Sequence, residues 1–156
     1  MNVDPGTGEV LPDGPTIPGT DVALVPLNLA ALSEDEIAQL IPTPVQAAGA
    51  LIRARELAQR VPDALDKRRR ELKTAERELT IALALGAQTL LTEYPRMPMT
   101  ERRDLARATD ARVKAAQDAV DTAWLLLEYT RDWDRAIGRD IDILRSLNAN
   151  LRGEHR

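Results

Sequence analysis

The sequence contains no cysteine and no phenylalanine, a single histidine, and only two residues each of tryptophan and tyrosine. Without cysteine, disulfides, thiolate metal sites and cysteine nucleophiles are excluded. The one histidine, His155, lies beyond Gly153 in the C-terminal tail. With no second histidine, neither a catalytic triad nor an imidazole metal site is expected there. The sequence therefore predicts no catalytic residues, no cofactor and no bound metal, and it does not indicate an enzyme.

Long apolar runs are also absent. The most apolar stretch, residues 81–91, is too short to span a membrane and contains Gln88. The first residues do not show the basic region followed by an apolar core that is typical of a signal peptide. We therefore expect a cytoplasmic protein that has no membrane partner.

Basic residues are missing from the first 43 positions, which hold seven Asp and Glu residues. Because the whole chain has a net charge of -4, the remaining residues carry a small positive charge. Residues 1–32 are also rich in proline and glycine, which predicts an acidic arm that is disordered or extended. Its last part, residues 21–32, is strongly apolar, so it either lies along the protein's own helices or docks on a neighbouring subunit or another protein.

The rest of the chain has the boundary signals of helices. Ser33 and Glu36 have the spacing of a capping box, in which each residue accepts a hydrogen bond from the backbone of the other. Pro42 cannot continue a helix. A short helix is therefore predicted over residues 33–41.

A first long helix is predicted over residues 44–93. Thr43 can cap it, and Pro44 suits the first helical position because its missing donor is not needed there. Apolar residues then recur at alternating spacings of three and four, which is a heptad pattern. Pro62 interrupts the segment, but the apolar pattern keeps its phase across it. We favour one helix kinked near Pro62 over two helices that meet at residue 61.

A second long helix is predicted over residues 100–152. Thr100 follows the last proline and can cap the helix, and Gly153 can end it, which leaves residues 153–156 as a tail. Residues 94–99 would form a tip loop, and so short a connection makes the two helices antiparallel neighbours. The predicted fold class is all-α: a long antiparallel coiled-coil-like helical hairpin, kinked near Pro62, preceded by a short helix and an extended acidic arm.

Such a hairpin would leave apolar side chains in water. Four lie on the second helix and two on the first, and they form the predicted interface: Val113, Val120, Trp124, Leu127, Ile81 and Leu85. Either the N-terminal arm covers them or a second chain does. We favour a homodimer that forms a four-helix bundle and also binds a protein partner.

A basic turn on the first long helix has two interpretations. It consists of Lys67, Arg68, Arg69, Arg70 and Lys73. These side chains could bind the phosphates of a nucleic acid. However, acidic residues alternate with them and no aromatic residue lies near enough to stack on a base, so we favour a solvated face with ion pairs to the opposite helix.

Two pairs of carboxylates occur at i and i+2 on the second long helix, Asp132 with Asp134 and Asp140 with Asp142. Residues at this spacing point to different faces of a helix, so they do not form a catalytic pair. We expect all four to be solvated.

The two ends of the chain resemble known proteins. Trp133, the run Ile-Asp-Ile-Leu-Arg-Ser-Leu-Asn at 141–148 and the run Leu-Arg-Gly-Glu at 151–154 resemble the ends of small helical proteins of bacteriophages, and residues 4–9 are similar to the starts of phage early proteins. Hosts of such phages would include actinobacteria. The resemblance implies a non-enzymatic interaction protein that holds a partner in replication or recombination. The alternatives are a nucleic-acid-binding accessory and a scaffold or virion component whose arm laces subunits together.

Overall fold

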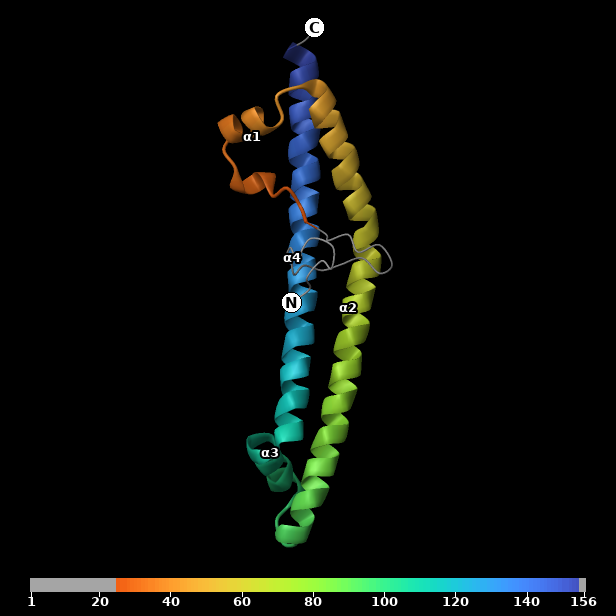
Figure 1. The fold of residues 1–156 in the computed structure, drawn as a ribbon, viewed down its shortest axis with the longest axis vertical. Coiled ribbons are helices and arrows are strands. Elements are labelled where there is room, and N and C mark those ends of the chain that lie inside the picture. The colour runs from red at the N-terminus through yellow and green to blue at the C-terminus, as the bar shows by residue number, and fades with distance from the viewer. Residues whose placement is uncertain (1–24, 155–156) are drawn as a thin grey trace, which may run out of the picture. The chain divides into compact units, whose positions relative to one another are not determined.

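In the computed structural model, residues 25–154 are described, and within this range the chain forms helices and no strand. The order is a 3₁₀ helix η1 (Leu29–Ala31), then α1 (Glu34–Leu40), α2 (Pro44–Glu93), α3 (Met99–Thr109) and α4 (Ala111–Glu154) (Figure 1). The predicted all-α class is confirmed. Most of the predicted acidic arm, residues 1–24, and His155 lie outside the described residues.

Local capping contacts determine where α1 and α2 begin. The Ser33 hydroxyl accepts a hydrogen bond from the Glu36 backbone N–H at 3.2 Å, and the Glu36 carboxylate accepts one from the Ser33 N–H at 3.4 Å. The Gln46 N–H donates to the Thr43 hydroxyl at 3.3 Å. These contacts satisfy backbone donors that have no partner inside the helix. The α2 helix keeps its helical assignment through Pro62, so two helices meeting at residue 61 are not observed.

The predicted single helix over residues 100–152 is wrong. The chain leaves the helical conformation at Asp110, where φ is -81° and ψ is 118°, and this residue separates α3 from α4. The Asp110 carboxylate accepts a hydrogen bond from the Arg112 N–H at 2.9 Å. A side-chain acceptor at this position satisfies a free donor of the new helix, which stabilises the break.

Two smaller boundaries also differ from the prediction. The α3 helix begins at Met99, and its N-cap is Pro98, so Thr100 is not the cap and the tip loop is one residue shorter than 94–99. The α4 helix passes Gly153 and ends at Glu154, so the predicted tail begins later. In the described part of the arm, residues 29–31 form η1 rather than an extended segment.

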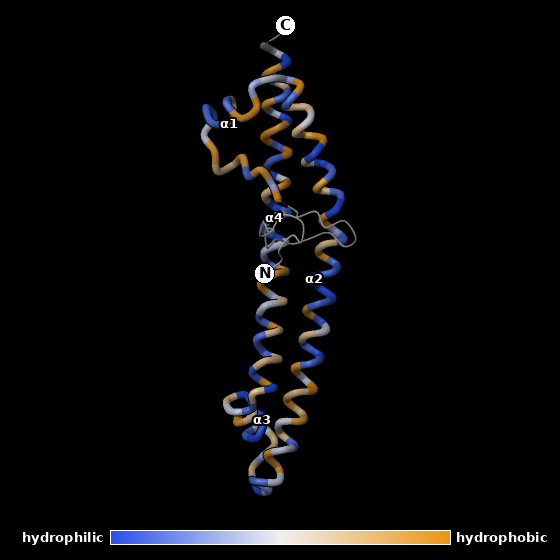
Figure 2. Tube along the Cα trace, viewed as in Figure 1, coloured by the Kyte–Doolittle hydropathy of each residue, from blue (hydrophilic) through white to orange (hydrophobic). Residues whose placement is uncertain are grey.

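The described residues divide into two compact units. We call residues 25–65 with 129–154 the terminal unit and Asp66–Glu128 the middle unit. Each unit contains part of α2 and part of α4, and in both parts apolar residues recur along the helices (Figure 2).

The core of the terminal unit joins segments from both ends of the chain. Its larger cluster consists of Leu29, Ile41, Ala47, Leu51, Ala54 and Leu144. Leu51 of α2 and Leu144 of α4 both belong to it, so the two long helices pack against each other in this unit. A second cluster contains Val61, Ala64 and Ile137, with Trp133 packed against it. The rings of Tyr129 and Trp133 lie 4.9 Å apart, centre to centre.

Small residues dominate the core of the middle unit. Its buried apolar side chains are Ala75, Ala87, Ala106, Val113, Ala123 and Leu127. Alanine and glycine let helices approach closely. At Gly86 of α2, an added Cβ would lie 3.0 Å from the Asp110 carboxylate and 3.1 Å from the Ala106 Cβ. The junction of α3 and α4 therefore packs directly against the backbone of α2.

Candidate interaction surfaces

The predicted interface residues do not form one surface. Val113 and Leu127 are buried, so neither is available to a partner. The prediction treated them as a second face of a straight helix with 3.6 residues per turn. Val113, Val120 and Leu127 are seven residues apart, and a seven-residue repeat drifts by only about 20° per heptad on such a helix. Val113 and Leu127 of this repeat both lie in the core of the middle unit, whereas Val120 between them is half-buried.

Trp124 lies at the edge of an open hollow in the middle unit. Its side chain is 51% exposed, and that of the neighbouring Leu125 is 59% exposed. The hollow has a volume of about 450 Å³ and is lined by Leu72, Glu76, Val120, Asp121, Trp124 and Leu125. We call it the Trp124 groove. Ile81 and Leu85 are also exposed, but they do not line this groove.

The basic turn forms ion pairs along its own helix. Arg68 Nη1 lies 2.9 Å from the Glu71 carboxylate, and the Arg68 side chain is only 11% exposed. Arg70 pairs with Asp66 at 2.8 Å, and Lys73 pairs with Glu76 at 3.4 Å. Among the described residues, no ion pair involves Lys67 or Arg69, and Lys67 is half-buried. Since Arg68 is covered and three of the five cations have acidic neighbours, little charge remains for phosphates.

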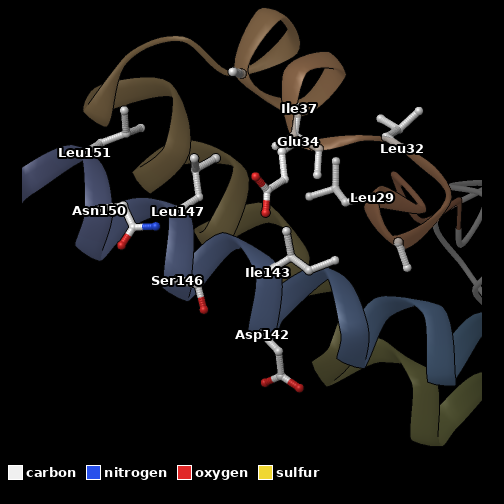
Figure 3. Close-up of a pocket in the computed structure, with 12 residues that line it drawn as sticks. Leu29, Leu32, Glu34, Ile37, Asp142, Ile143, Ser146, Leu147, Asn150 and Leu151 are labelled. Carbon is white, nitrogen blue, oxygen red and sulfur yellow. The ribbon is translucent and has the colours of Figure 1, made fainter.

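A second groove lies in the terminal unit between α1 and the last turns of α4 (Figure 3). It has a volume of about 650 Å³, and its apolar lining comes from Leu29, Leu32, Ile37, Ile143, Leu147 and Leu151. Figure 3 shows the Glu34 carboxylate between α1 and α4, above Ile143 and beside Leu147. No basic residue lines the groove. We call it the α1–α4 groove.

Asp140 is not solvated, contrary to the prediction. It is 2% exposed, whereas its neighbour at i+2, Asp142, is exposed. One Asp140 carboxylate oxygen accepts a hydrogen bond from the Leu29 N–H at 2.7 Å, and the other accepts one from the Asn28 N–H at 3.0 Å. Asn28 has the left-handed backbone conformation, with φ of 56°, that turns the chain into η1. The Asp140 carboxylate of α4 thus caps η1, which lies far from it in the sequence. It also fixes the segment that forms one wall of the α1–α4 groove.

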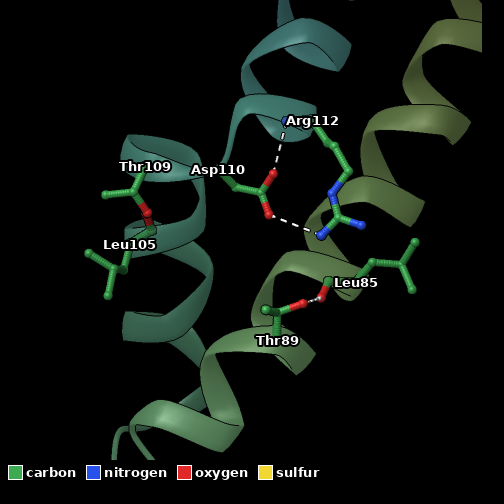
Figure 4. Close-up of polar contacts among 6 residues, drawn as sticks. All are labelled: Leu85, Thr89, Leu105, Thr109, Asp110 and Arg112. Carbon is green, nitrogen blue, oxygen red and sulfur yellow. Dashed lines mark hydrogen bonds and ion pairs between the residues drawn. The ribbon is translucent and has the colours of Figure 1, made fainter.

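Asp110 has the most clearly perturbed ionisation in the described residues. The hydrogen bond from the Arg112 guanidinium, which lies 3.3 Å from Asp110, and the bond from the Arg112 backbone N–H lower the pKa of this carboxyl below its usual value (Figure 4). The carboxylate therefore keeps its charge, and with it the cap, at neutral pH. Beside it, the Thr109 hydroxyl donates to the Leu105 carbonyl at 2.7 Å at the end of α3. This polar cluster fixes a helix junction, and its arrangement does not resemble a catalytic site.

Arg102 of α3 is a buried cation, and it is only 8% exposed. Its Nη2 lies 3.9 Å from the Met99 sulfur, while Nε and Nη1 have no hydrogen-bond partner in the described part of the chain. An unpaired buried guanidinium lowers stability. Arg102 lines neither the Trp124 groove nor the α1–α4 groove, so it belongs to neither candidate surface.

Within residues 25–154, no group of three or more His, Asp and Glu side chains could hold a metal ion. Within the same range, no helix combines the length and the apolar content that a membrane span requires.

Comparison with known proteins adds no relative. No family model matches the chain, and no curated protein or solved structure matches it.

Proposed function

We propose that the protein is a non-enzymatic interaction protein that pairs with a second copy of itself through the Trp124 groove and holds another protein. The observation that supports this proposal is the exposure of Trp124 and Leu125 beside an open, largely apolar hollow. Large aromatic side chains that fill pockets supply much of the binding energy at protein interfaces. A half-exposed indole next to a hollow is therefore a good candidate for such a contact.

A second copy suits this groove because one surface offers both parts of the contact. Trp124 lines the hollow of about 450 Å³ and is 51% exposed, so the same surface offers an aromatic side chain and a space that could receive one. In a two-fold symmetric pair, each indole would enter the hollow of the other chain. Among the acids at the rim, Glu76 already pairs with Lys73, which reduces the repulsion between two copies.

The size of the effect follows from the exposed area. About half of a tryptophan side chain corresponds to roughly 125 Å² of surface, which gives about 3 kcal/mol when it is removed from water. Two indoles would contribute twice this amount before the entropy of association is subtracted. The two indoles alone give less than the roughly 8 kcal/mol that a micromolar dimer needs, so Leu125 and the other apolar residues that line the groove must be buried in the pair as well.

The biological setting of the proposal comes from the resemblance of the chain ends to phage proteins. A paired helical protein beside replication or recombination proteins would act as an adaptor, with the Trp124 groove for self-association and other surfaces for partners. The basic turn, in which three of the five cations have acidic partners on their own helix, gives less support to direct contact with nucleic acid.

Sedimentation equilibrium tests the pairing. The unmodified chain should be a dimer at micromolar concentration, and Trp124→Ala should be a monomer with the same helical circular dichroism. Tyr94→Ala is the matched control because Tyr94 is 45% exposed and does not line the groove. A monomeric unmodified chain, or equal dimerisation of the unmodified chain and Trp124→Ala, would refute pairing through this groove.

A further inference from the structure

The α1–α4 groove has two features that together describe a partner. Its floor is apolar, with Ile143, Leu147 and Leu151 at spacings of four along α4 and with Leu32 and Ile37 opposite them. Leu32, Ile37, Ile143, Leu147 and Leu151 are only partly buried against the core of the terminal unit. An apolar side chain from another molecule would therefore complete the packing of this region.

The charged side chains that line the groove are all acidic. Glu34 and Asp142 line it, and no lysine or arginine does. Glu34 forms no hydrogen bond or ion pair among the described residues, and Figure 3 places its carboxylate over the apolar floor. Asp35 and Glu36 add two more exposed carboxylates to the first turn of α1. Glu34 is exposed, and an unpaired carboxylate beside an apolar surface favours a cation at that point.

We propose that the α1–α4 groove binds a basic amphipathic helix of another protein. The apolar side chains of this helix, at i, i+3, i+4 and i+7, would pack between α1 and α4, and a lysine or arginine beside them would pair with Glu34. This inference deepens the proposed function, on which it rests, because it assigns the chemistry of the held partner. It uses the terminal unit, whereas self-association uses the Trp124 groove of the middle unit.

The buried Asp140 contact makes this groove a defined site. The bonds from Asn28 and Leu29 hold η1 against α4, and Leu29 is fully buried. Since η1 and the chain that follows it supply Leu29 and Leu32, the wall of the groove is fixed before a partner arrives. A preformed wall lowers the entropy lost on binding.

A designed peptide probe tests the proposal. The probe is a fluorescently labelled 14-residue helix of leucine and lysine with one apolar face, and binding to the full chain is followed by fluorescence anisotropy. Two control peptides are used: one with glutamate in place of lysine, and one with the same leucines and lysines in an order that gives no apolar face. We expect binding of the first peptide in the micromolar range and no saturable binding of either control.

Two charge-reversed variants locate the contact. Glu34→Lys should weaken binding of the lysine peptide about fivefold or more, whereas Asp118→Lys, an equal change at an exposed site in the middle unit, should change it less than twofold. Amide shifts in ¹⁵N spectra should move at Ile37, Ile143 and Leu147 and stay fixed at Trp124.

Four outcomes would overturn the proposal. They are absence of binding, equal binding of the faceless peptide, equal effects of the two charge reversals, and loss of the dimer in Glu34→Lys, which would make a second copy the occupant of this groove. Because the dimer is measured separately through Trp124→Ala, failure of the peptide to bind leaves the self-association result intact. The two conclusions therefore fail independently.

Discussion

Replacement of Asp140 by alanine should release the segment around η1 from α4. The carboxylate accepts bonds of 2.7 Å from the Leu29 N–H and 3.0 Å from the Asn28 N–H. A hydrogen bond to a charged group contributes about 1.5–3 kcal/mol, and a buried donor left without a partner adds a desolvation cost. Asn28 is exposed, so water can replace its bond, whereas Leu29 is 0% exposed and its N–H would remain unsatisfied. We estimate a loss of about 3 kcal/mol, most of it from Leu29.

Amide hydrogen exchange measures this loss where it occurs. Because η1 can detach without global unfolding, the effect should appear as faster exchange of the Leu29 amide, by about a hundredfold for 3 kcal/mol. Asp142→Ala is the matched control. Asp142 is exposed on a different face of α4, so its replacement should change the free energy of unfolding by less than about 0.5 kcal/mol. Asp140→Asn keeps one acceptor oxygen and should fall between the two. If Leu29 exchanges equally fast in Asp140→Ala and Asp142→Ala, the role given to Asp140 is wrong.

Three further changes test other parts of the structure. Gly138→Ala should raise the free energy of unfolding by about 0.5–1 kcal/mol because a Cβ there meets nothing within 4 Å, whereas Gly86→Ala should lower it because the Cβ would press on Asp110 and Ala106; equal shifts in thermal denaturation would contradict this packing. Arg102→Met should leave stability unchanged or raise it by about 1 kcal/mol, since it removes an unpaired buried cation, and a clear loss in urea denaturation would show that the guanidinium has a stabilising partner. The pKa of Asp110 is lower in the folded chain than its value near 3.8 in the unfolded chain, so its contribution to stability is complete above pH 3.8 and is lost as the pH falls through the folded pKa. The NMR shift of the Asp110 carboxyl carbon should therefore titrate with a midpoint below pH 3.8. A midpoint at or above pH 3.8 would contradict the contact with Arg112.

The helix starts could be predicted from the sequence because they depend on neighbouring residues. Ser33 with Glu36, and Thr43 with Pro44, satisfy backbone donors within one turn, and the structure contains both arrangements. The break at Asp110 was missed because no proline or glycine marks it. Aspartate is a common N-cap, and the sequence alone does not show whether a mid-helix aspartate caps a new helix or faces solvent.

Burial of Asp140 could not be derived from its neighbours on α4. Its partners are 111 and 112 residues away, in a segment whose place depends on the tertiary fold. One sign was present: Asp140 lies three residues after Ile137 and four before Leu144, so it shares the face of two core residues. A charged residue on an apolar face is rarely buried without a partner, so this position indicates a hydrogen-bond donor from a distant segment.

The Trp124 groove was predicted only in part. The spacing of Val113, Val120 and Leu127 indicated an apolar face, but which members would remain exposed depended on how α4 lies against α2. Leu125 was not singled out because it lies off that repeat, although it is among the more exposed apolar residues of the groove. Sequence periodicity identifies apolar faces, while the division between core and surface needs the packed structure.

The fluorescence of Trp124 tests the central claim most directly. In a Trp133→Phe chain, Trp124 is the only tryptophan. If two copies bury this side chain in each other's groove, its emission should lie at short wavelength at micromolar concentration and shift to the red on dilution to the nanomolar range. An emission maximum that stays at the long wavelength of a water-exposed indole across the whole range would contradict the account.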